Sequence, residues 1–390
     1  MKPMQEILSA RQFKLIAIPA LVVAVFGVCL WIYQGFAGMD ATNMSDSNPW
    51  GLYLMAFMFT VGVAVGSLLV AAVPHVWGGS AADFKGVSKL GAWSAICAAV
   101  LSVGFVVIDL GGPLRVWELF IYSNLSSPLM WDIFALPLFL IIAIAYLWTL
   151  VRADIHKASE RAVKVMSAVA IVASLVLCFV DAWIFGLLPG RALWNTALLG
   201  PWFLAAAVAS GMALVMILVQ ATKNVAAFAL PQNALPRMGR VLLVAVGIDL
   251  LCLVCDLMVA GYGGAAHAKV VASLISGELA PIFWVEVICA VAAMALLVAS
   301  KAKGALLGAS ILVLTSVFCK RIQFMLSGFL DMQAPYAGVQ TAGFVGTAPL
   351  ATPLYAPSLV EMGITLAVVA LGIALIVVGM RKLPLSAPAE

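Results

Sequence analysis

The sequence predicts an all-α integral membrane protein with about ten transmembrane helices. Hydrophobic residues make up 65% of the chain and charged residues only 10%, a composition that excludes a soluble globular domain. The apolar residues form about ten runs of roughly 20 residues, each long enough to cross the hydrocarbon core as a helix. The basic residues lie almost entirely in alternate loops. Together these observations predict a single membrane domain over residues 1–390.

The apolar runs place each span in turn. The predicted spans cover residues 15–35, 50–74, 89–109, 129–150, 163–186, 201–221, 240–259, 281–299, 304–326 and 359–380. On one side of the membrane the connections are longer and rich in Gly, Pro, Ser and Asn, at about 33–49, 110–128, 187–200, 260–280 and 327–358. Such connections are candidates for docking a partner protein.

The basic residues set the orientation. Of 21 Lys and Arg residues, sixteen fall on one side, two lie within a span, and only Arg115, Arg191 and Lys269 fall on the other side. Because basic residues are retained in the cytoplasm during insertion, both termini are predicted to be cytoplasmic and the number of crossings to be even. The net positive charge is then an insertion signal and gives no support to nucleic-acid binding.

An internal repeat relates spans two to five to spans six to nine, at an offset of about 150 residues. Pro49-Trp50 opens the first unit and Pro201-Trp202 opens the second, and small residues that permit close helix packing follow each pair. Four spans restore the starting direction. The sequence therefore predicts two parallel four-helix bundles, over residues 50–186 and 201–326, with one extra helix at each end. An interfacial preference of Trp and Pro is the alternative explanation for the Pro-Trp pairs alone.

The sequence does not supply the ligands of a resident redox centre. Its seven cysteines are scattered singly, and Cys252 and Cys255 form a lone CxxC without a second ligand pair. His75, His156 and His267 are predicted at a span end and in loops on opposite sides, so they cannot form the histidine pair that a membrane b-type haem needs. We therefore expect no haem, no iron–sulfur cluster and no metal in this chain.

The ionisable residues of the spans gather in the half of the membrane away from the termini. The acids placed there are Asp109, Asp132, Asp181, Asp256, Glu286 and Glu361, with Asp249 near the middle. Lys320 and Arg321 are the predicted charge partners for two of these acids. A bare carboxylate inside a membrane is costly, so such groups usually pair or line a hydrated site. The pattern predicts a polar site that opens toward the outer face and handles an amphipathic or protonatable molecule.

Several short strings of residues, in a fixed order, extend over most of the chain. They are Asn48-Pro-Trp-Gly-Leu-Tyr53, Ile108-Asp-Leu-Gly-Gly-Pro-Leu-Arg115, Asn124-Leu-Ser-Ser-Pro-Leu-Met-Trp-Asp132, Trp194-Asn-Thr-Ala-Leu-Leu-Gly-Pro201, Phe283-Trp-Val-Glu286 and Tyr355-Ala-Pro-Ser-Leu-Val-Glu361. Together they resemble the NrfD/PsrC-like membrane subunits of respiratory complexes, and the ten-span branch of that family most closely.

The resemblance implies a subunit of a bacterial or archaeal cytoplasmic membrane that binds quinone, either menaquinone or ubiquinone, and carries no cofactor of its own. Its implied partners are an extracytoplasmic ferredoxin-like iron–sulfur subunit, which exchanges electrons with the quinone, and often a molybdopterin-type catalytic subunit. By family position, Tyr53, Asp109, Trp131 and Asp132 are expected around the quinone headgroup. Quinone chemistry also moves protons, and we expect them to be exchanged mainly at the outer face.

The resemblance assigns further roles less directly. Asp181, Asp256 and Glu286 are candidates for proton transfer, and Arg115 and Arg191 for partner docking or local ion pairs. Some relatives use a histidine in span two or around span five. This chain has apolar residues in the first region and Asp181 in the second, so its headgroup contacts differ in detail.

Two other functions fit some of the same features. A secondary transporter would also carry ten spans, internal repeats and intramembrane acids. However, the predicted repeats are parallel rather than inverted, and the inner half lacks the charges that alternating access would use. A purely structural anchor for a periplasmic enzyme is the remaining alternative. In that case, substitution of the acids would leave electron transfer to quinone intact.

Overall fold

Ten long helices form the protein in the computed structural model, which describes residues 7–44, 48–155, 157–189, 191, 193–222, 225–330 and 355–386. They are α1 (Ala10–Ala37), α2 (Leu52–Val76), α3 (Ser88–Asp109), α5 (Pro128–Asp154), α6 (Glu160–Gly186), α7 (Leu199–Ala221), α8 (Ala234–Tyr262), α10 (Ala280–Ala299), α11 (Lys303–Leu330) and α12 (Leu359–Lys382). Each is long and apolar enough to cross a membrane, which confirms the predicted ten spans. The largest boundary difference is at the start of α8, predicted at residue 240 and observed at Ala234.

Short helices occupy several of the connections. They are η1 (Met39–Ala41), η2 (Gly79–Val87), η3 (Pro113–Arg115), α4 (Glu118–Ile121), η4 (Val225–Phe228) and α9 (Ala265–Ser276). The segments that hold α4 and α9 were predicted only as long loops. α9 forms because Val270 and Leu274, one helical turn apart, are buried on one face, and it packs against α8, α10 and α11.

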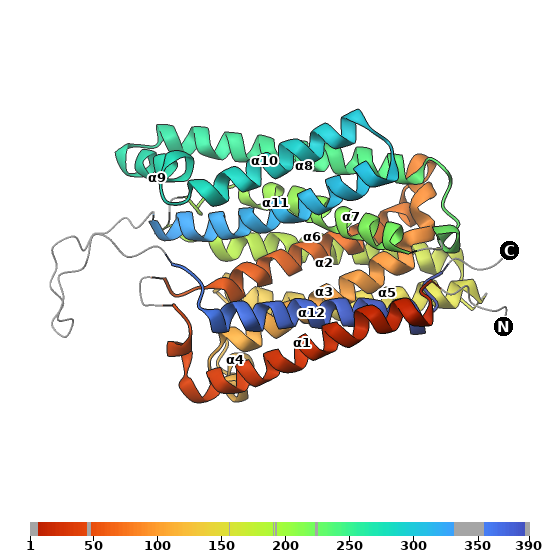
Figure 1. Cartoon of the computed structure of the whole chain (residues 1–390), viewed down its shortest axis with the longest axis horizontal. Coiled ribbons are helices and arrows are strands. Elements are labelled where there is room, and N and C mark those ends of the chain that lie inside the picture. Colours follow the sequence, from red (N-terminus) through yellow and green to blue (C-terminus); the bar gives the residue numbers. More distant parts are fainter. Residues whose placement is uncertain are drawn as a thin grey trace.

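The long helices run roughly parallel to one another (Figure 1). Successive long helices reverse direction, so two ends of the molecule can be named. α2, α5, α7, α10 and α12 begin at the Asp109 end, where α3 terminates. The same helices finish at the Asp154 end, where α5 terminates. The start of α1 and the finish of α12 also lie at the Asp154 end, where Arg381 donates a hydrogen bond of 2.9 Å to the carbonyl oxygen of Leu8.

α2 is the central helix. It packs against α3, α6, α7 and α11. In its most apolar 18-residue stretch 89% of the residues are buried, whereas the corresponding share in α1 is 11%. α1 packs on α12, which in turn packs on α3. A second set of helices packs around α7. In this set α7 contacts α8 and α11, and α10 contacts the same two helices. The core therefore lies around α2 and α7, and α1 is a peripheral, lipid-facing helix.

The crossing of α2 and α7 depends on small residues. A β-carbon on Gly66 would overlap the carbonyl group of Ala207, and one on Gly211 would overlap the backbone of Gly66 and Ser67. The two backbones thus approach each other as closely as glycine allows. This confirms the close packing expected from the small residues after each Pro-Trp pair.

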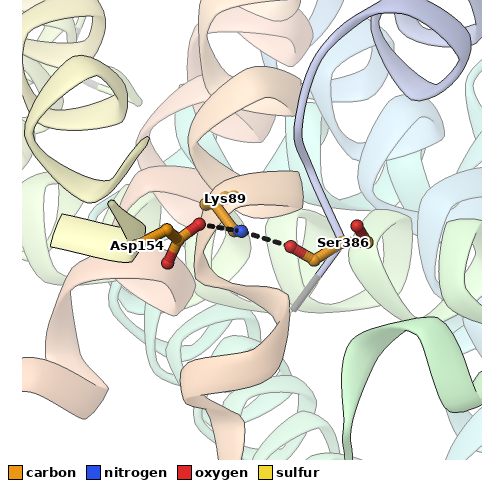
Figure 2. A network of polar contacts seen from close by, with 3 residues as sticks. All are labelled: Lys89, Asp154 and Ser386. Atoms are coloured by element: carbon orange, nitrogen blue, oxygen red, sulfur yellow. Dashed lines mark hydrogen bonds and ion pairs between the residues drawn. The ribbon is translucent and has the colours of Figure 1, made fainter. Parts of the chain in front are cut away.

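A buried lysine ties the chain together at the Asp154 end. Lys89, in the first turn of α3, forms an ion pair of 2.5 Å with Asp154 at the end of α5. It also donates a hydrogen bond to the carbonyl oxygen of Ser386, beyond α12 (Figure 2). The segment after α12 is therefore held against the ends of α3 and α5.

Candidate functional site

A hydrogen-bonded group of polar side chains lies at the Asp109 end, between α1, α2 and α3. Tyr53, in the first turn of α2, is fully buried. Its hydroxyl donates a hydrogen bond of 2.6 Å to the amide oxygen of Gln34, in the last turn of α1. The amide nitrogen of Gln34 donates to the carbonyl oxygen of Ile108 at 3.4 Å. Asp109 is the next residue of α3, and its carboxylate interacts electrostatically with Tyr53.

The start of α12 extends this group. Glu361 is fully buried, and its carboxylate accepts hydrogen bonds from the Tyr355 hydroxyl and from the backbone amides of Ser358 at 2.8 Å and Asn43 at 3.1 Å. The Tyr355 hydroxyl also accepts a hydrogen bond of 2.8 Å from the amide of Leu52. Burial, and then the bond to Glu361, raises the pKa of Tyr355, so its hydroxyl stays protonated and donates.

We call Gln34, Tyr53, Asp109, Tyr355 and Glu361 the Tyr53 group. An apolar groove of about 310 Å³ between α1, α3 and α12 ends beside it. Ile108 makes the connection, because its side chain lines the groove while its carbonyl oxygen accepts the bond from Gln34. The arrangement offers hydrogen-bond donors and acceptors at the end of an apolar groove.

A second set of polar residues lies between α5, α6 and α11. Asp132 of α5 and Asp181 of α6 are both buried and interact electrostatically with each other. Asp181 also interacts with the guanidinium group of Arg321, which α11 contributes. Among the described residues, one oxygen of each carboxylate has no hydrogen-bond partner.

The four residues expected around a quinone headgroup therefore have different interaction partners. Tyr53 and Asp109 lie together in the Tyr53 group, whereas Asp132 interacts with Asp181. Trp131 is 36% exposed, donates its indole N–H to the carbonyl oxygen of Leu125 at 2.7 Å and meets the ring of Trp183 edge-on at 6.3 Å. Trp131 and Asp132 project differently from α5 because successive residues of a helix are about 100° apart.

A third set lies between α8, α10 and α11. Lys320 and Asp249 form a buried ion pair, and the lysine nitrogen lies 4.2 Å from the ring centroid of Trp202. Glu286 of α10 is buried and interacts electrostatically with Lys320. In the described part of the chain, neither carboxylate oxygen of Glu286 has a hydrogen-bond partner. Asp256, half-buried and two turns beyond Asp249, also interacts with Lys320.

The next residue of α11 points elsewhere. Arg321 is 1% exposed, and its guanidinium carbon lies 3.8 Å from the ring centroid of Phe203. It is also beside α2, where a β-carbon on Gly62 would come within 3.5 Å of its Nη2 atom. Thus Lys320 forms its ion pair with Asp249 of α8. The strongest charge interaction of Arg321 is with Asp181 of α6, and it also interacts with Asp249 and Glu286.

Comparison with known proteins identifies the family. The family model described as polysulphide reductase, NrfD, matches residues 40–332. The chain belongs to this NrfD family. The match spans α2 to α11, which together contain every one of the acids described above except Glu361.

Two curated relatives are similar to this NrfD-family chain over most of its length. A putative membrane subunit of dimethyl sulfoxide reductase from Halobacterium salinarum is 25% identical over 93% of this chain and 89% of the relative. A selenate reductase subunit from Mesobacillus selenatarsenatis is 22% identical over 93% of this chain and 92% of the relative. An Hdr-like menaquinol oxidoreductase integral membrane subunit from Archaeoglobus fulgidus is 24% identical over 53% of this chain and 50% of the relative.

The two arginines expected in docking or ion pairs have different surroundings. Arg115, in η3, forms an exposed ion pair of 2.7 Å with Glu118, and this bond lowers the pKa of Glu118. Arg191, half-buried, donates to the carbonyl oxygen of Gly328 at 3.0 Å and lies 5.7 Å from the ring centroid of Trp194. Arg191 thus caps the C-terminal end of α11, where the helix dipole favours a cation.

Metal and haem ligands were expected to be absent from this NrfD-family chain. Within the ranges that the structure describes, no three His, Cys, Asp or Glu side chains lie close enough together to hold a metal ion. His75 interacts with the hydroxyl of Ser88 at 3.1 Å. His156 lies outside the described residues, and the side chain of His267 is not among those described.

Sequence reasoning missed two members of the Tyr53 group and gave a third no role. Gln34 carried a usable signal, since it is the one strongly polar side chain within the first predicted span. Glu361 also carried a signal in the sequence, because Ser358 and Glu361 have the spacing of a capping box. Both hydrogen bonds of that capping box are present in the structure. Tyr355 had no local signal, because its bond to Leu52 joins segments 303 residues apart.

Proposed function

We propose that this NrfD-family chain is the quinone-binding membrane subunit of a respiratory oxidoreductase. In this role it passes electrons between the membrane quinone pool and an extracytoplasmic iron–sulfur subunit. The observation that carries the proposal is the Tyr53 group at the end of the apolar groove between α1, α3 and α12. A quinone has the matching form, with a polar headgroup and a long apolar tail.

The chemistry of the Tyr53 group suits both redox states of a quinone. Quinone oxygens accept hydrogen bonds, and the hydroxyl of Tyr53 and the amide of Gln34 would donate to them in exchange for their present bonds to Gln34 and Ile108. Quinol hydroxyls donate, and the carboxylate of Asp109 and the amide oxygen of Gln34 are acceptors. Oxidation of a quinol releases two electrons and two protons. Asp109 is half-buried at the very end of α3, a position from which it can take up a proton and pass it to water.

The other acids have supporting roles in this proposal. Asp132 and Asp181 form a second proton-exchanging pair, with Trp131 exposed beside them. Asp256 and Glu286 are proton-transfer candidates held near Lys320. None of these four acids lies in the helix turns at the Asp154 end of the molecule. We therefore propose that protons are exchanged mainly at the Asp109 end, and that this end faces the outside of the cell.

The relatives support the assignment of partners. Two of them are named as subunits of reductases, and a third as a menaquinol oxidoreductase membrane subunit. We propose that the partners of this chain are a ferredoxin-like iron–sulfur subunit and a molybdopterin-type catalytic subunit, and that menaquinone is its quinone. The partners would dock at the Asp109 end, where Arg115 is exposed.

The proposed topology has both termini in the cytoplasm and two four-helix bundles. Helices α2, α3, α5 and α6 would form the first bundle, and α7, α8, α10 and α11 the second. The packing partners of these helices and the excess of basic residues in the loops at the Asp154 end support this topology. Reporter fusions at both termini would test it.

The central test is quinol-dependent reduction of a co-purified iron–sulfur partner, followed by rapid-mixing spectroscopy. The wild type would be compared with Asp109→Asn, Asp132→Asn and, as a matched control, Asp40→Asn, an exposed acid at the same end of the molecule. We expect Asp109→Asn to slow reduction by about tenfold or more in an assembled complex, and Asp40→Asn to leave it unchanged.

Other outcomes separate the alternatives. If Asp132→Asn slows reduction of the partner and Asp109→Asn does not, the quinone headgroup binds beside α5 and α6 and not at the Tyr53 group. Absence of quinol reactivity in the assembled wild type would favour a structural anchor or a transporter. In proteoliposomes, quinone-linked proton uptake from the cytoplasmic side would contradict proton exchange at the outer face.

A further inference from the structure

A second apolar groove lies at the Asp154 end, far from the Tyr53 group. It has a volume of about 600 Å³ and lies between the last turns of α2, the middle of α7, the start of α8 and the short helix η2. Leu69 and Val73 of α2 form one wall, Val208 and Met212 of α7 form the floor, and α8 forms the opposite wall. Leu69 is sixteen residues beyond Tyr53 on α2, which is roughly 24 Å along the helix axis. The two grooves are therefore separate sites.

The depth of this groove matches one leaflet of a membrane. Val208 lies thirteen residues before the end of α7 at Ala221, roughly 20 Å along its axis. The hydrocarbon core of a bilayer is about 30 Å thick. The groove thus extends from the membrane surface at the Asp154 end to about the middle of the bilayer, and its walls are apolar over this length.

Two arginines stand at the shallow end of the groove. Arg237 and Arg240 lie in the first two turns of α8, three residues apart and so on one face of the helix. Arg237 forms an ion pair with Asp83 of η2. Arg240 is exposed, and among the described residues no ion pair engages it. One net positive charge and several unused guanidinium N–H groups therefore face the membrane surface at this point.

We propose that this groove binds one anionic phospholipid from the leaflet at the Asp154 end. The phosphate group accepts hydrogen bonds from the guanidinium groups of Arg240 and Arg237, for which the planar fork of arginine is well suited. One acyl chain lies along Val73, Val208 and Met212. The net positive charge, which Arg240 supplies, selects an anionic lipid over a zwitterionic one, because a zwitterionic headgroup brings its own cation to the site.

The proposed lipid has a structural consequence. α2 and α8 pack on α7 but make few contacts with each other, so the groove is the gap between them. A bound acyl chain fills this gap and adds apolar contacts to all three helices. The lipid would thus stabilise the joint between α2 and the second set of helices, independently of any quinone at the other end.

The test measures lipid retention by the purified full-length protein in mild detergent, using native mass spectrometry with added phosphatidylglycerol or phosphatidylcholine. Three variants are compared with the wild type. Arg240→Gln removes the positive charge of residue 240. Val208→Trp fills the floor of the groove and leaves both arginines in place. Lys301→Gln is the control, since Lys301 is an exposed cation at the same end, between α10 and α11.

We expect the wild type to retain phosphatidylglycerol about tenfold more tightly than phosphatidylcholine, which corresponds to one charge-assisted hydrogen bond. Arg240→Gln should abolish this preference, Lys301→Gln should keep it, and Val208→Trp should lower the retention of both lipids. Equal retention of the two lipids by the wild type would overturn the proposal. So would an unchanged preference in Arg240→Gln, or a quinone retained in place of a phospholipid and displaced by Val208→Trp.

Discussion

Lys320 of α11 and Asp249 of α8 form an ion pair that is almost completely shielded from solvent. Each residue lies well inside its helix, so the pair sits within the apolar part of the molecule. Charged groups in such surroundings are tolerated when they are paired, and the ring of Trp202 gives the ammonium group a further favourable contact. The pair fixes the position of α11 relative to α8.

Breaking this pair from one side should be costly. Lys320→Met leaves the carboxylate of Asp249 buried without its partner, and we expect a loss of about 3–5 kcal/mol of stability. The double variant Lys320→Met, Asp249→Asn removes both charges and should recover much of that loss. Thermal unfolding in detergent would measure all three proteins. Equal stability of the single variant and the wild type would show that the pair contributes nothing.

The two arginines in the connections at the Asp109 end should respond differently to truncation. Arg191→Ala removes the hydrogen bond to Gly328 and the contact with Trp194, and we expect a loss of about 1–2 kcal/mol. Arg115→Ala breaks only an exposed ion pair and should leave stability unchanged. If Arg115 docks a partner, its variant should instead weaken co-purification of the proposed iron–sulfur partner. Thermal unfolding and co-purification would measure these effects. An Arg115→Ala variant that unfolds at a lower temperature but keeps its partner would contradict both the expected stability and the docking role.

The spans could be predicted from the sequence because the length of an apolar run is a one-dimensional signal. The six extra residues at the start of α8, 234–239, could not, because Pro236, Arg237 and Gly239 interrupt the apolar run there although the helix continues. The helix α9 was missed for a different reason. Its burial through Val270 and Leu274 depends on α8, α10 and α11 surrounding it, which no local pattern reveals.

The candidate site was predictable only in part. Counting residues along each span placed the acids in one half of the molecule, but it could not show which of them meet. Lys320 and Arg321 are adjacent in the chain and were both predicted as charge partners, yet Lys320 pairs with Asp249 of α8 whereas Arg321 interacts most strongly with Asp181 of α6. Rotation about the helix axis also separates Trp131 from Asp132. Tertiary contacts of this kind, such as that of Tyr53 with Gln34, follow from how helices pack and not from local sequence.

Tyr355 predicts a specific dependence of stability on pH. Its pKa is raised by burial and by its bond to Glu361, so the folded protein keeps the phenol protonated at a pH where the unfolded chain ionises. The contribution of Tyr355 is therefore fully present below about pH 10, the usual pKa of tyrosine, and is lost as the pH rises above it. The difference in unfolding temperature between wild type and Tyr355→Phe should shrink from pH 9 to pH 11. A difference that stays constant over that range would contradict this account.

The crossing of α2 and α7 predicts the most severe effect of a single substitution. Gly66→Leu would drive a side chain into the carbonyl group of Ala207, and because backbone cannot move aside as a flexible side chain can, the two helices would have to separate. We expect the variant to lose about 3 kcal/mol or more and to accumulate poorly in membranes. Gly35→Ala is the matched control, since a β-carbon at Gly35 meets no atom within 4 Å. It should be neutral or slightly stabilising, because alanine favours the helix by about 1 kcal/mol. Normal accumulation and unfolding temperature of Gly66→Leu would show that α2 and α7 do not cross at this glycine.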